Sequence, residues 1–427
     1  MRTLLKGGQV LNGGRLLPMD IEILDGRVSA RGQSLSPLGC DRVLELNGLA
    51  VFPGFVDVHV HLREPGFSYK ETIRTGTRAA ARGGCTAVCA MPNLNPAPDC
   101  PEHLALQEDI IRHDAAIRVI PYGCITVGQK GEGQLTDMSA LAPRVAGFSD
   151  DGRGVKDEST MREAMLRCKA AGSLIAAHCE DTSLIPPGGA IHDGPFARAH
   201  GIPGIPSESE WRPIQRDLRL AKETGCRYHV CHVSCKESVA LIRQAKAEGV
   251  DVTCETGPHY LLLSQDDLQD EGRFKMNPPL RDAADREALM DGLIDGTIDM
   301  IATDHAPHSA DEKAKGLRGS AMGVVGIETA FPLLYTHLVE KGLLSLERLI
   351  ACLTAAPRRR FGLDGGLNVG DPAEITVFDL HAQETVNPAD FLSLGRATPF
   401  EGWPVNAACR LTLCGDDIVY STLEGGC

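Results

Sequence analysis

The stretch PGFVDVHVHLR at residues 53–63 decides the fold prediction, because it is an apolar, strand-like run that ends in polar side chains. Side chains alternate between the two faces of a strand, so His59 and His61 project from the same face. Two imidazoles on one face can converge on one metal ion. A His-x-His pair alone is a weak indication, but its position at the end of an apolar strand strengthens it.

Strand-like apolar runs alternate with helical stretches through the middle of the chain, such as 158–171 and 237–248. This alternation predicts βα units and a parallel sheet. Eight strands are expected, which is the number that a closed (β/α)₈ barrel of about 250 residues needs. They are expected to end near His61, Asn93, Tyr122, Asp151, His178, His232, Glu255 and Asp304. The predicted fold class is therefore α/β, with a TIM barrel at its centre.

Both ends of the chain contain short strand-like runs with turns between them. Asn12-Gly13 and Asp25-Gly26 are strong hairpin signals near the start, and 373–379 and 410–420 continue this pattern near the end. We therefore predict one small β-sandwich domain, built from 1–52 and 365–427. The barrel is then expected to occupy 53–364.

Bulk composition restricts the class of protein. Hydrophobic residues make up 43% of the 427 residues and charged residues 23%, which is typical of a soluble globular enzyme. The formal net charge of −14 argues against non-specific nucleic-acid binding, which needs a basic face. The chain has no signal-peptide-like start and no apolar run of about 18 residues, so we expect no membrane association and a cytoplasmic location.

The cysteine and glycine patterns indicate no further cofactor. Fifteen cysteines are spread along the chain without the spacing of a zinc knuckle, so we expect mostly buried, reduced thiols. The glycines form no phosphate-binding or dinucleotide-binding fingerprint.

Polar residues recur where the later strands are expected to end. Asp151, His178, His232 and Asp304 lie at such positions, in addition to the first histidine pair. Each one alone could be a hydrogen-bonded core histidine or an aspartate that caps a helix. Together, four histidines and two aspartates supply enough ligands for two metal ions that share a bridging group.

Five motifs carry a family resemblance that covers nearly the whole chain. They are DVHVHLREPG at 57–66, MPN at 91–93, NPPLR at 277–281, DHAPH at 304–308 and GVVGIET at 323–329. These segments resemble those of the dihydroorotases in the amidohydrolase superfamily. The resemblance implies a distorted (β/α)₈ barrel with a β module formed by both chain ends. It also implies a zinc-dependent cyclic amide hydrolase that interconverts dihydroorotate and N-carbamoyl-L-aspartate in pyrimidine synthesis.

The resemblance also implies how the metal ligands divide. His59 and His61 would bind one zinc ion together with Asp304, and His178 and His232 would bind the other. We assign the bridge to Asp151. Successive strand residues face opposite ways, so Asp150 would point away if Asp151 points into the barrel mouth. A carboxylated lysine, as in many amidohydrolases, is the alternative, and Lys156 is the candidate for it.

Two bound zinc ions would lower the pKa of a bridging water, so that hydroxide is available near neutral pH. Asp304 is expected to act as general base and then as general acid toward the leaving amide nitrogen. Arg63 lies two residues beyond His61 and is expected to bind the substrate carboxylate with its planar, two-pronged guanidinium. By resemblance, Asn93 and His308 help to hold that carboxylate, and Asn277 lies over the ring.

Other residues near these motifs are expected to assist the site indirectly. Five polar residues are candidates for orienting the ligands: Glu180, Asp181, His229, His259 and His305. The segment 309–316 is expected to be a flexible loop where an active-site lid would sit.

Two alternative functions stay open on the sequence. A hydantoinase or allantoinase would share the His-x-His strand, but such enzymes normally use a carboxylated lysine and lack the set of Arg63, Asn93 and His308. A non-catalytic scaffold subunit would normally have lost metal ligands, and none of the six is missing here. The family resemblance also suggests a homodimer and an association with aspartate transcarbamoylase.

Overall fold

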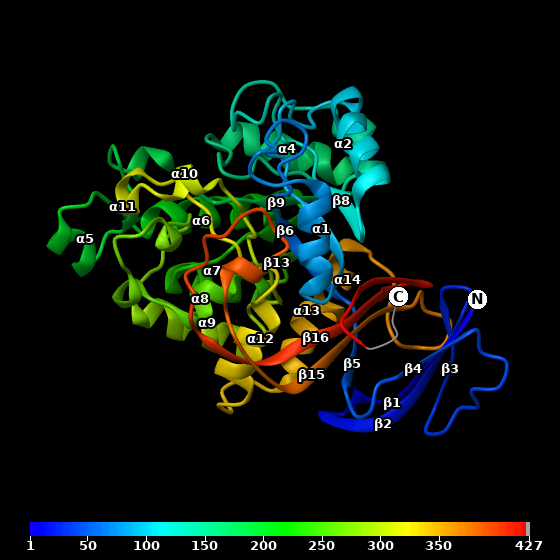
Figure 1. Cartoon of the computed structure of the whole chain (residues 1–427). Coiled ribbons are helices and arrows are strands. Elements are labelled where there is room, and N and C mark those ends of the chain that lie inside the picture. Colours follow the sequence, from blue (N-terminus) through cyan, green and yellow to red (C-terminus); the bar gives the residue numbers. More distant parts are fainter. Residues whose placement is uncertain (424–427) are drawn as a thin grey trace.

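The computed structural model describes residues 1–423, and a closed parallel β-barrel forms its centre (Figure 1). Strands β6-β7-β8 form one part of the wall and β14-β13-β12-β9 the other. Bridges from Phe148 to Gly123 and to Ile175 join β8 to β9, and a bridge from Val60 to His305 joins the last strand to the first. The barrel strands are β6 (Phe55–Val60), β7 (Cys85–Ala90), β8 (Arg118–Pro121), β9 (Leu174–Ala177), β12 (Arg227–Val230), β13 (Val252–Thr256) and β14 (Met300–Ile301).

The eight expected strand positions are thereby confirmed, although the one at Phe148 forms only single bridges to its neighbours. Inside the barrel, Val58 packs with Tyr122 and Cys231, and the Tyr122 hydroxyl donates to the Val58 carbonyl at 3.0 Å. Asp57 pairs with Val88 and Val60 with Ala90, so two residues of β6 oppose one residue of β7. This bulge falls at Val58 and His59. Bulges next to active sites commonly re-aim a side chain.

Helices connect and cover the barrel strands. The expected helix at 158–171 is α4, and the one at 237–248 is α7, so both predictions are confirmed. The helices are α1 (Ile73–Arg82), α2 (Pro101–Asp114), α3 (Met138–Leu141), α4 (Glu158–Ala170), α5 (Pro195–His200), α6 (Glu208–Thr224), α7 (Lys236–Ala247), α8 (Pro258–Leu262), α9 (Ala283–Asp295), α10 (Ala310–Lys313), α11 (Gly316–Gly319), α12 (Ala330–Leu334), α13 (Leu346–Leu353) and α14 (Ala355–Phe361). Two short strands, β10 (Ile191–His192) and β11 (Gly204–Ile205), pair outside the barrel.

Helix α4 begins with an aspartate cap. The Asp157 carboxylate accepts the Thr160 N–H at 2.8 Å and the hydroxyl hydrogens of Ser159 and Thr160, both at 2.6 Å. These hydrogen bonds lower the pKa of Asp157 to about 2, with the Ser159 hydroxyl contributing most. The cap therefore stabilises the helix in its ionised form.

The two ends of the chain build one sheet, as predicted. Its order is β17-β16-β15-β5-β1-β2-β3, with β4 paired to β1, and β5 meets β15 where Val51 faces Val377. The N- and C-terminal parts accordingly lie beside each other in Figure 1. The strands are β1 (Arg2–Asn12), β2 (Arg15–Leu24), β3 (Arg27–Gly32), β4 (Arg42–Glu45), β5 (Ala50–Pro53), β15 (Glu374–Thr385), β16 (Pro404–Cys414) and β17 (Asp417–Ser421).

The sheet encloses an apolar cluster of its own, with residues from both ends such as Ile23, Val51 and Leu411. Two-residue turns join β1 to β2 and β2 to β3. Asp25 and Gly26 in the second turn both have positive φ, 50° and 73°, as the predicted hairpin requires. The division at residues 52/53 and 364/365 stays a prediction.

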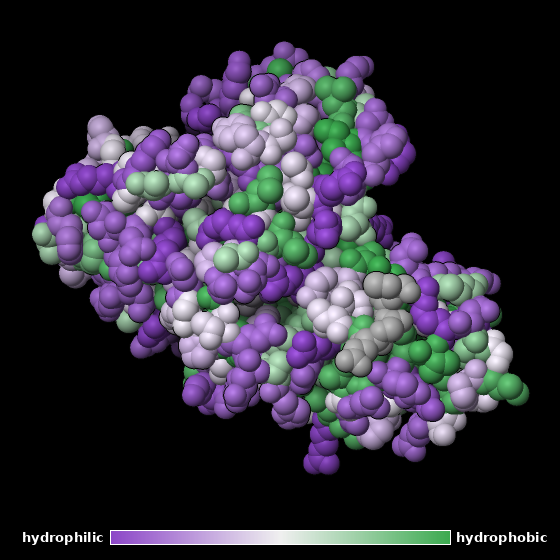
Figure 2. Space-filling model, in the orientation of Figure 1, coloured by the Kyte–Doolittle hydropathy of each residue, from purple (hydrophilic) through white to green (hydrophobic). Residues whose placement is uncertain are grey.

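The outer surface is mostly hydrophilic on the face shown in Figure 2, with hydrophobic residues in scattered patches. Within residues 1–423, no helix has the length and apolar character that a membrane span requires. In the same range all cysteines are free thiols, and most are buried, as expected.

Candidate metal centre and substrate cavity

Six side chains from distant parts of the chain meet at the carboxyl ends of the barrel strands. Asp151 lies at the centre: its Oδ1 is 3.4 Å from His59 Nε2, and its Oδ2 is 3.6 Å from His61 Nε2. The same Oδ1 is 3.7 Å from both His178 Nδ1 and His232 Nε2. One carboxylate thus lies between two pairs of imidazoles, which is the arrangement that a bridging ligand needs.

Asp304 lies with the first pair of histidines. Its Oδ1 is 3.0 Å from His61 Nε2 and 3.5 Å from His59 Nε2. Burial acts to raise the pKa of Asp304, but the neighbouring His59 and His61 lower it to about 2. The carboxylate is therefore ionised at neutral pH, and it can accept a proton or bind a cation.

The donor atoms fit a metal centre. All six side chains are buried, and His59 Nε2 and Asp151 Oδ1 have no hydrogen-bond partner. Buried polar atoms are nearly always paired, and a bound cation would pair these two, which face each other. Two groups of ligand atoms are close enough to hold one ion each: His59 with His61 and Asp151, and Asp151 with His178 and His232. Imidazole and carboxylate are ligands that suit zinc.

The two other candidates for the bridging ligand, Asp150 and Lys156, bind partners outside the histidine cluster. Asp150 points away from the cluster and accepts backbone N–H groups from Ile125 and Thr126, at 2.9 and 3.2 Å. Lys156 is exposed, and its Nζ lies 3.0 Å from Glu132. Among the three, only Asp151 faces the histidines.

Three of the expected site residues have strained backbones. Arg63, His232 and Asp304 have φ of 62°, 35° and 46°, in the left-handed region that non-glycine residues rarely adopt. Such outliers cluster at functional sites, where the surrounding structure holds them. Here the strain falls on one expected substrate ligand and two expected metal ligands.

A cavity of about 250 Å³ opens above the cluster. Its lining includes nine of the ten expected site residues: His61, Arg63, Asn93, Asp151, His178, His232, Asn277, Asp304 and His308. The tenth, His59, lies beneath them and is 0% exposed. The residues that are expected to bind substrate and the candidate metal ligands therefore line the same cavity.

The residues that are expected to bind the substrate carboxylate all lie in the lining of this cavity. Arg63 Nε donates to the Pro307 carbonyl at 3.2 Å, and its Nη2 is 3.4 Å from His308 Nε2. Burial and the nearby cations Arg63 and Lys70 lower the pKa of His308 to about 3, so this imidazole is neutral. Asn93 Nδ2 donates to the Asp151 carbonyl at 2.7 Å.

Elsewhere in the cavity lining, Asn277 Nδ2 donates to Glu180 Oε1 at 2.8 Å, and the second oxygen of Glu180 lies 3.5 Å from His178 Nε2. Of the five residues considered for orienting ligands, Glu180 therefore contacts two expected site residues directly. Asp181 instead accepts the N–H of Ser183, and His305 lies 3.5 Å from the buried Glu71. His259 is buried with Nε2 unpaired, and burial lowers its pKa to about 4.

Two residues next to the site received no role from the sequence. Glu255 is buried and binds His59 Nδ1 at 2.8 Å and His229 Nε2 at 2.6 Å. Burial acts to raise its pKa, but these imidazoles hold that pKa below its usual value. Lys70 Nζ lies 3.2 Å from His308 Nδ1. A carboxylate at a strand end was a visible signal for Glu255, whereas Lys70 had none.

The segment 309–316, expected to be a loop, is partly helical. Helix α10 lies in this segment and α11 begins at its end, and the Ser309 side chain caps α10 through the Glu312 N–H. Lys313 is buried, and its Nζ donates to the carbonyls of Lys275, Ala321 and Gly323 at 3.0, 2.8 and 2.6 Å. The polar composition suggested a solvated loop, but these three bonds join α10 to the connecting segments at 275 and 321–323.

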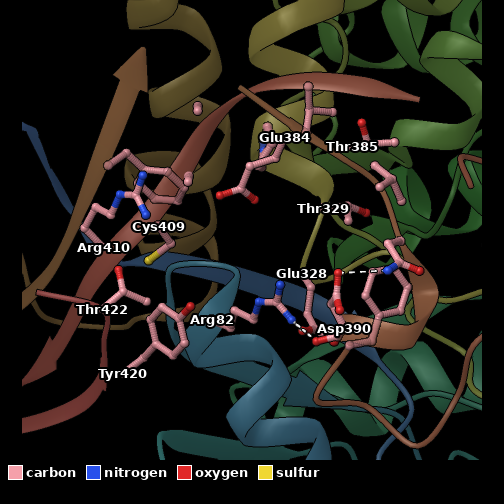
Figure 3. Close-up of a pocket in the computed structure, with 18 residues that line it drawn as sticks. Arg82, Glu328, Thr329, Glu384, Thr385, Asp390, Cys409, Arg410, Tyr420 and Thr422 are labelled. Carbon is pink, nitrogen blue, oxygen red and sulfur yellow. Dashed lines mark hydrogen bonds and ion pairs between the residues drawn. The ribbon is translucent and has the colours of Figure 1, made fainter. Parts of the chain in front are cut away.

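A second cavity, of about 280 Å³, lies between the barrel and the terminal sheet (Figure 3). Arg82 projects into it from α1 and binds Glu328 at 3.1 Å and the Asp390 carbonyl. None of the ten expected site residues is among those that line it. Its central charged groups neutralise each other, so the metal-centre cavity is the better candidate for the active site.

A parallel barrel with four imidazoles and two carboxylates at its mouth defines the amidohydrolase class. Among solved structures, the L-hydantoinase from Arthrobacter aurescens is similar, with a TM-score of 0.88, 29% identity, and coverage of 99% of this chain and 96% of that one. A dihydropyrimidinase from Brevibacillus agri has a TM-score of 0.86 at 22% identity, covering 99% and 95%. The predicted fold class is confirmed.

Sequence relatives narrow the class further. Residues 48–238 match the family model described as Dihydro-orotase-like. A dihydroorotase from Geobacillus thermodenitrificans is 51% identical over 425 residues, covering 98% of this chain and 99% of its own length. One from Brevibacillus brevis is 49% identical over 428 residues, covering 99% and 100%. The chain belongs to the dihydroorotase family.

Proposed function

We propose that this chain catalyses the reversible hydrolysis of dihydroorotate to N-carbamoyl-L-aspartate, a step of pyrimidine synthesis. The observation that carries the proposal is the single cavity in which Arg63 and His308 lie beside the cluster of six candidate metal ligands. Such a cavity can hold a ring with a carboxylate at one end and an amide at the other. Full-length relatives named dihydroorotase, about half identical in sequence, support it.

The candidate ligands divide as the family resemblance implies. His59, His61 and Asp304 would hold one zinc ion, His178 and His232 would hold a second, and Asp151 would bridge them. Bound zinc supplies Lewis acidity, which activates water and polarises an amide carbonyl. Distances of 3.0 to 3.7 Å from the two carboxylates to the imidazoles support this division.

The chain's own groups would bind the substrate and move the proton. Arg63, Asn93 and His308 would hold the carboxylate, and Asn277 would lie over the ring. Asp304, ionised and buried, would accept a proton from the attacking water and deliver it to the leaving amide nitrogen. Ring closure uses the same groups in reverse. Acid favours closure, because closing the ring consumes a carboxylate and a proton.

The direct test is turnover of dihydroorotate against hydantoin and allantoin by the purified, zinc-loaded protein. We expect kcat/KM to be highest for dihydroorotate, and a preference for either other ring would instead indicate a hydantoinase or allantoinase. Metal analysis of the same sample separates an enzyme from a scaffold subunit: about two zinc ions per chain are expected. A folded protein that neither binds zinc nor turns over dihydroorotate would be a scaffold.

The family resemblance suggests how the protein assembles. We propose a homodimer in the cytoplasm, with an association with aspartate transcarbamoylase as a further prediction. Size-exclusion chromatography with light scattering tests the dimer, and co-purification of the two proteins tests the association.

A further inference from the structure

We propose that Glu255 is a positioning residue that presets one histidine of each pair of the metal centre, His59 and His232. The inference rests on the proposed function, because it concerns how the chain prepares the ligands for zinc. Glu255 lies in β13 at the end of the strand, is 1% exposed, and does not line the substrate cavity. Its action would therefore pass through the histidines that it touches.

Glu255 contacts the first histidine pair from behind. Its Oε1 lies 2.8 Å from His59 Nδ1, while His59 Nε2 faces Asp151 and Asp304 at 3.4 and 3.5 Å. An ionised carboxylate only accepts hydrogen bonds, so His59 Nδ1 must carry the proton. Metal binding requires a deprotonated ring nitrogen, which leaves Nε2 as the ligand atom, and Nε2 faces the two candidate metal-binding carboxylates. Glu255 thus fixes both the rotation and the tautomer of His59.

The same carboxylate reaches the second pair through the backbone. Oε1 also accepts the main-chain N–H of His232 at 3.3 Å, and His232 has a φ of 35°. A hydrogen bond to this N–H helps to hold a conformation that costs energy in a non-glycine residue. His232 Nε2 lies 2.9 Å from His178 Nδ1, and the two nitrogens form one group of candidate ligand atoms with Asp151.

The second oxygen of Glu255 is held by a side chain outside the ligand set. His229 Nε2 donates to Oε2 at 2.6 Å, and His229 Nδ1 pairs with the Thr253 hydroxyl at 2.8 Å. Both carboxylate oxygens are therefore fixed. Replacing buried charged groups with apolar ones is often neutral or stabilising, so fold stability alone gives little reason for a carboxylate here. Orientation of the metal ligands does give a reason for a carboxylate, because residues that hold ligands in place tune metal affinity.

The test compares zinc binding by Glu255→Gln with that of a matched control, Glu328→Gln. Glu328 is also a buried carboxylate with three donors, namely Arg82 and the N–H groups of Leu392 and Ser393, but it lies away from the metal centre. Zinc affinity of the metal-stripped, refilled proteins is measured by competition with a chromophoric chelator. Unfolding of the zinc-free forms is measured in parallel.

We expect Glu255→Gln to weaken zinc binding 10- to 100-fold, as replacing residues that orient metal ligands typically does. Glu328→Gln should change zinc affinity less than about 3-fold, although its zinc-free form unfolds more easily. Zinc affinity of Glu255→Gln equal to the wild type would overturn the inference while leaving the proposed function intact. A wild-type protein that binds no zinc would instead overturn the proposed function.

A second measurement needs no folded Glu255 variant. Long-range ¹H–¹⁵N spectra of the zinc-free wild type, with the His59 signals assigned through a His59→Gln sample, report which ring nitrogen is protonated. At a pH high enough to remove the second ring proton, we expect the remaining proton on Nδ1. A His59 protonated on Nε2 alone would overturn the inference, because Glu255 would then not set the tautomer.

Discussion

Exchanging Asp151 for asparagine should remove zinc binding with little loss of stability in the zinc-free protein. The same exchange at Asp150 should leave zinc binding intact and destabilise the zinc-free protein. The two carboxylates are adjacent in sequence, but their surroundings differ. Asp151 Oδ1 is buried without a hydrogen-bond partner and faces three imidazoles, and its Oδ2 faces the fourth. Asp150 accepts N–H groups from Ile125, Thr126 and Gly131.

The expected magnitudes follow from these contacts. In Asp150→Asn an amide NH₂ faces a buried N–H donor, which costs about 1–3 kcal/mol of folding free energy. For Asp151→Asn, replacing residues that merely orient ligands already weakens metal binding 10- to 100-fold, so losing the bridge should cost at least about 100-fold. With free zinc at 100 times the wild-type Kd, zinc stabilises the wild type by about 2.7 kcal/mol. A 100-fold weaker variant retains only about 0.4 kcal/mol of that gain.

The assay is denaturant unfolding of each protein with and without zinc, together with metal analysis. Asp150→Asn should keep the zinc-dependent gain on a lower baseline, and Asp151→Asn should lose the gain. If Asp150→Asn lost zinc and Asp151→Asn kept it, the assignment of the bridge would be wrong.

Three further predictions concern the substrate site and stability. Arg63→Met should raise KM for dihydroorotate by about 10- to 100-fold, since charged hydrogen bonds contribute about 1.5–3 kcal/mol, with zinc content unchanged; zinc loss as large as in His61→Gln would contradict this. Lys70→Gln should raise KM several-fold because it removes a cation beside His308, whereas Lys70→Arg keeps the charge and should have a KM close to that of the wild type. Equal KM values for Lys70→Gln and the wild type in steady-state assays would argue against a role for Lys70. Asp157→Ala should lower the free energy of unfolding by about 1 kcal/mol at pH 7. The folded-state pKa of Asp157 is lowered to about 2, so this stabilisation is present above about pH 4 and is lost as the pH falls toward 2; denaturant unfolding from pH 7 to 2 should show the difference closing, and a constant difference would contradict the cap.

The sequence predicted the barrel because each strand has an apolar run with a polar end, and these patterns are local. The bulge at Val58 and His59 was not predictable, since it depends on how β6 pairs with β7. The short helices within 309–319 were missed for a similar reason. Its polar composition resembles a loop, and the carbonyls that bind Lys313 come from residues at 275, 321 and 323.

The ten expected site residues were found from strand ends and family motifs, and nine of them line one cavity. Glu255 shows what such reasoning omits. Its place at a strand end was visible, but its function depends on the partners of its two oxygens, which lie far away in the chain. A residue that acts by orienting other residues has no characteristic sequence motif from which that role could be recognised.

The pairing of β5 with β15 also has a consequence for synthesis of the protein. Residues 50–53 leave the ribosome long before 374–385, their partner in the terminal sheet. Until then the nascent chain presents an unpaired strand edge, which is a site for association with other chains. Premature termination before residue 374 should therefore yield aggregation-prone fragments, even though every candidate zinc ligand has already been made.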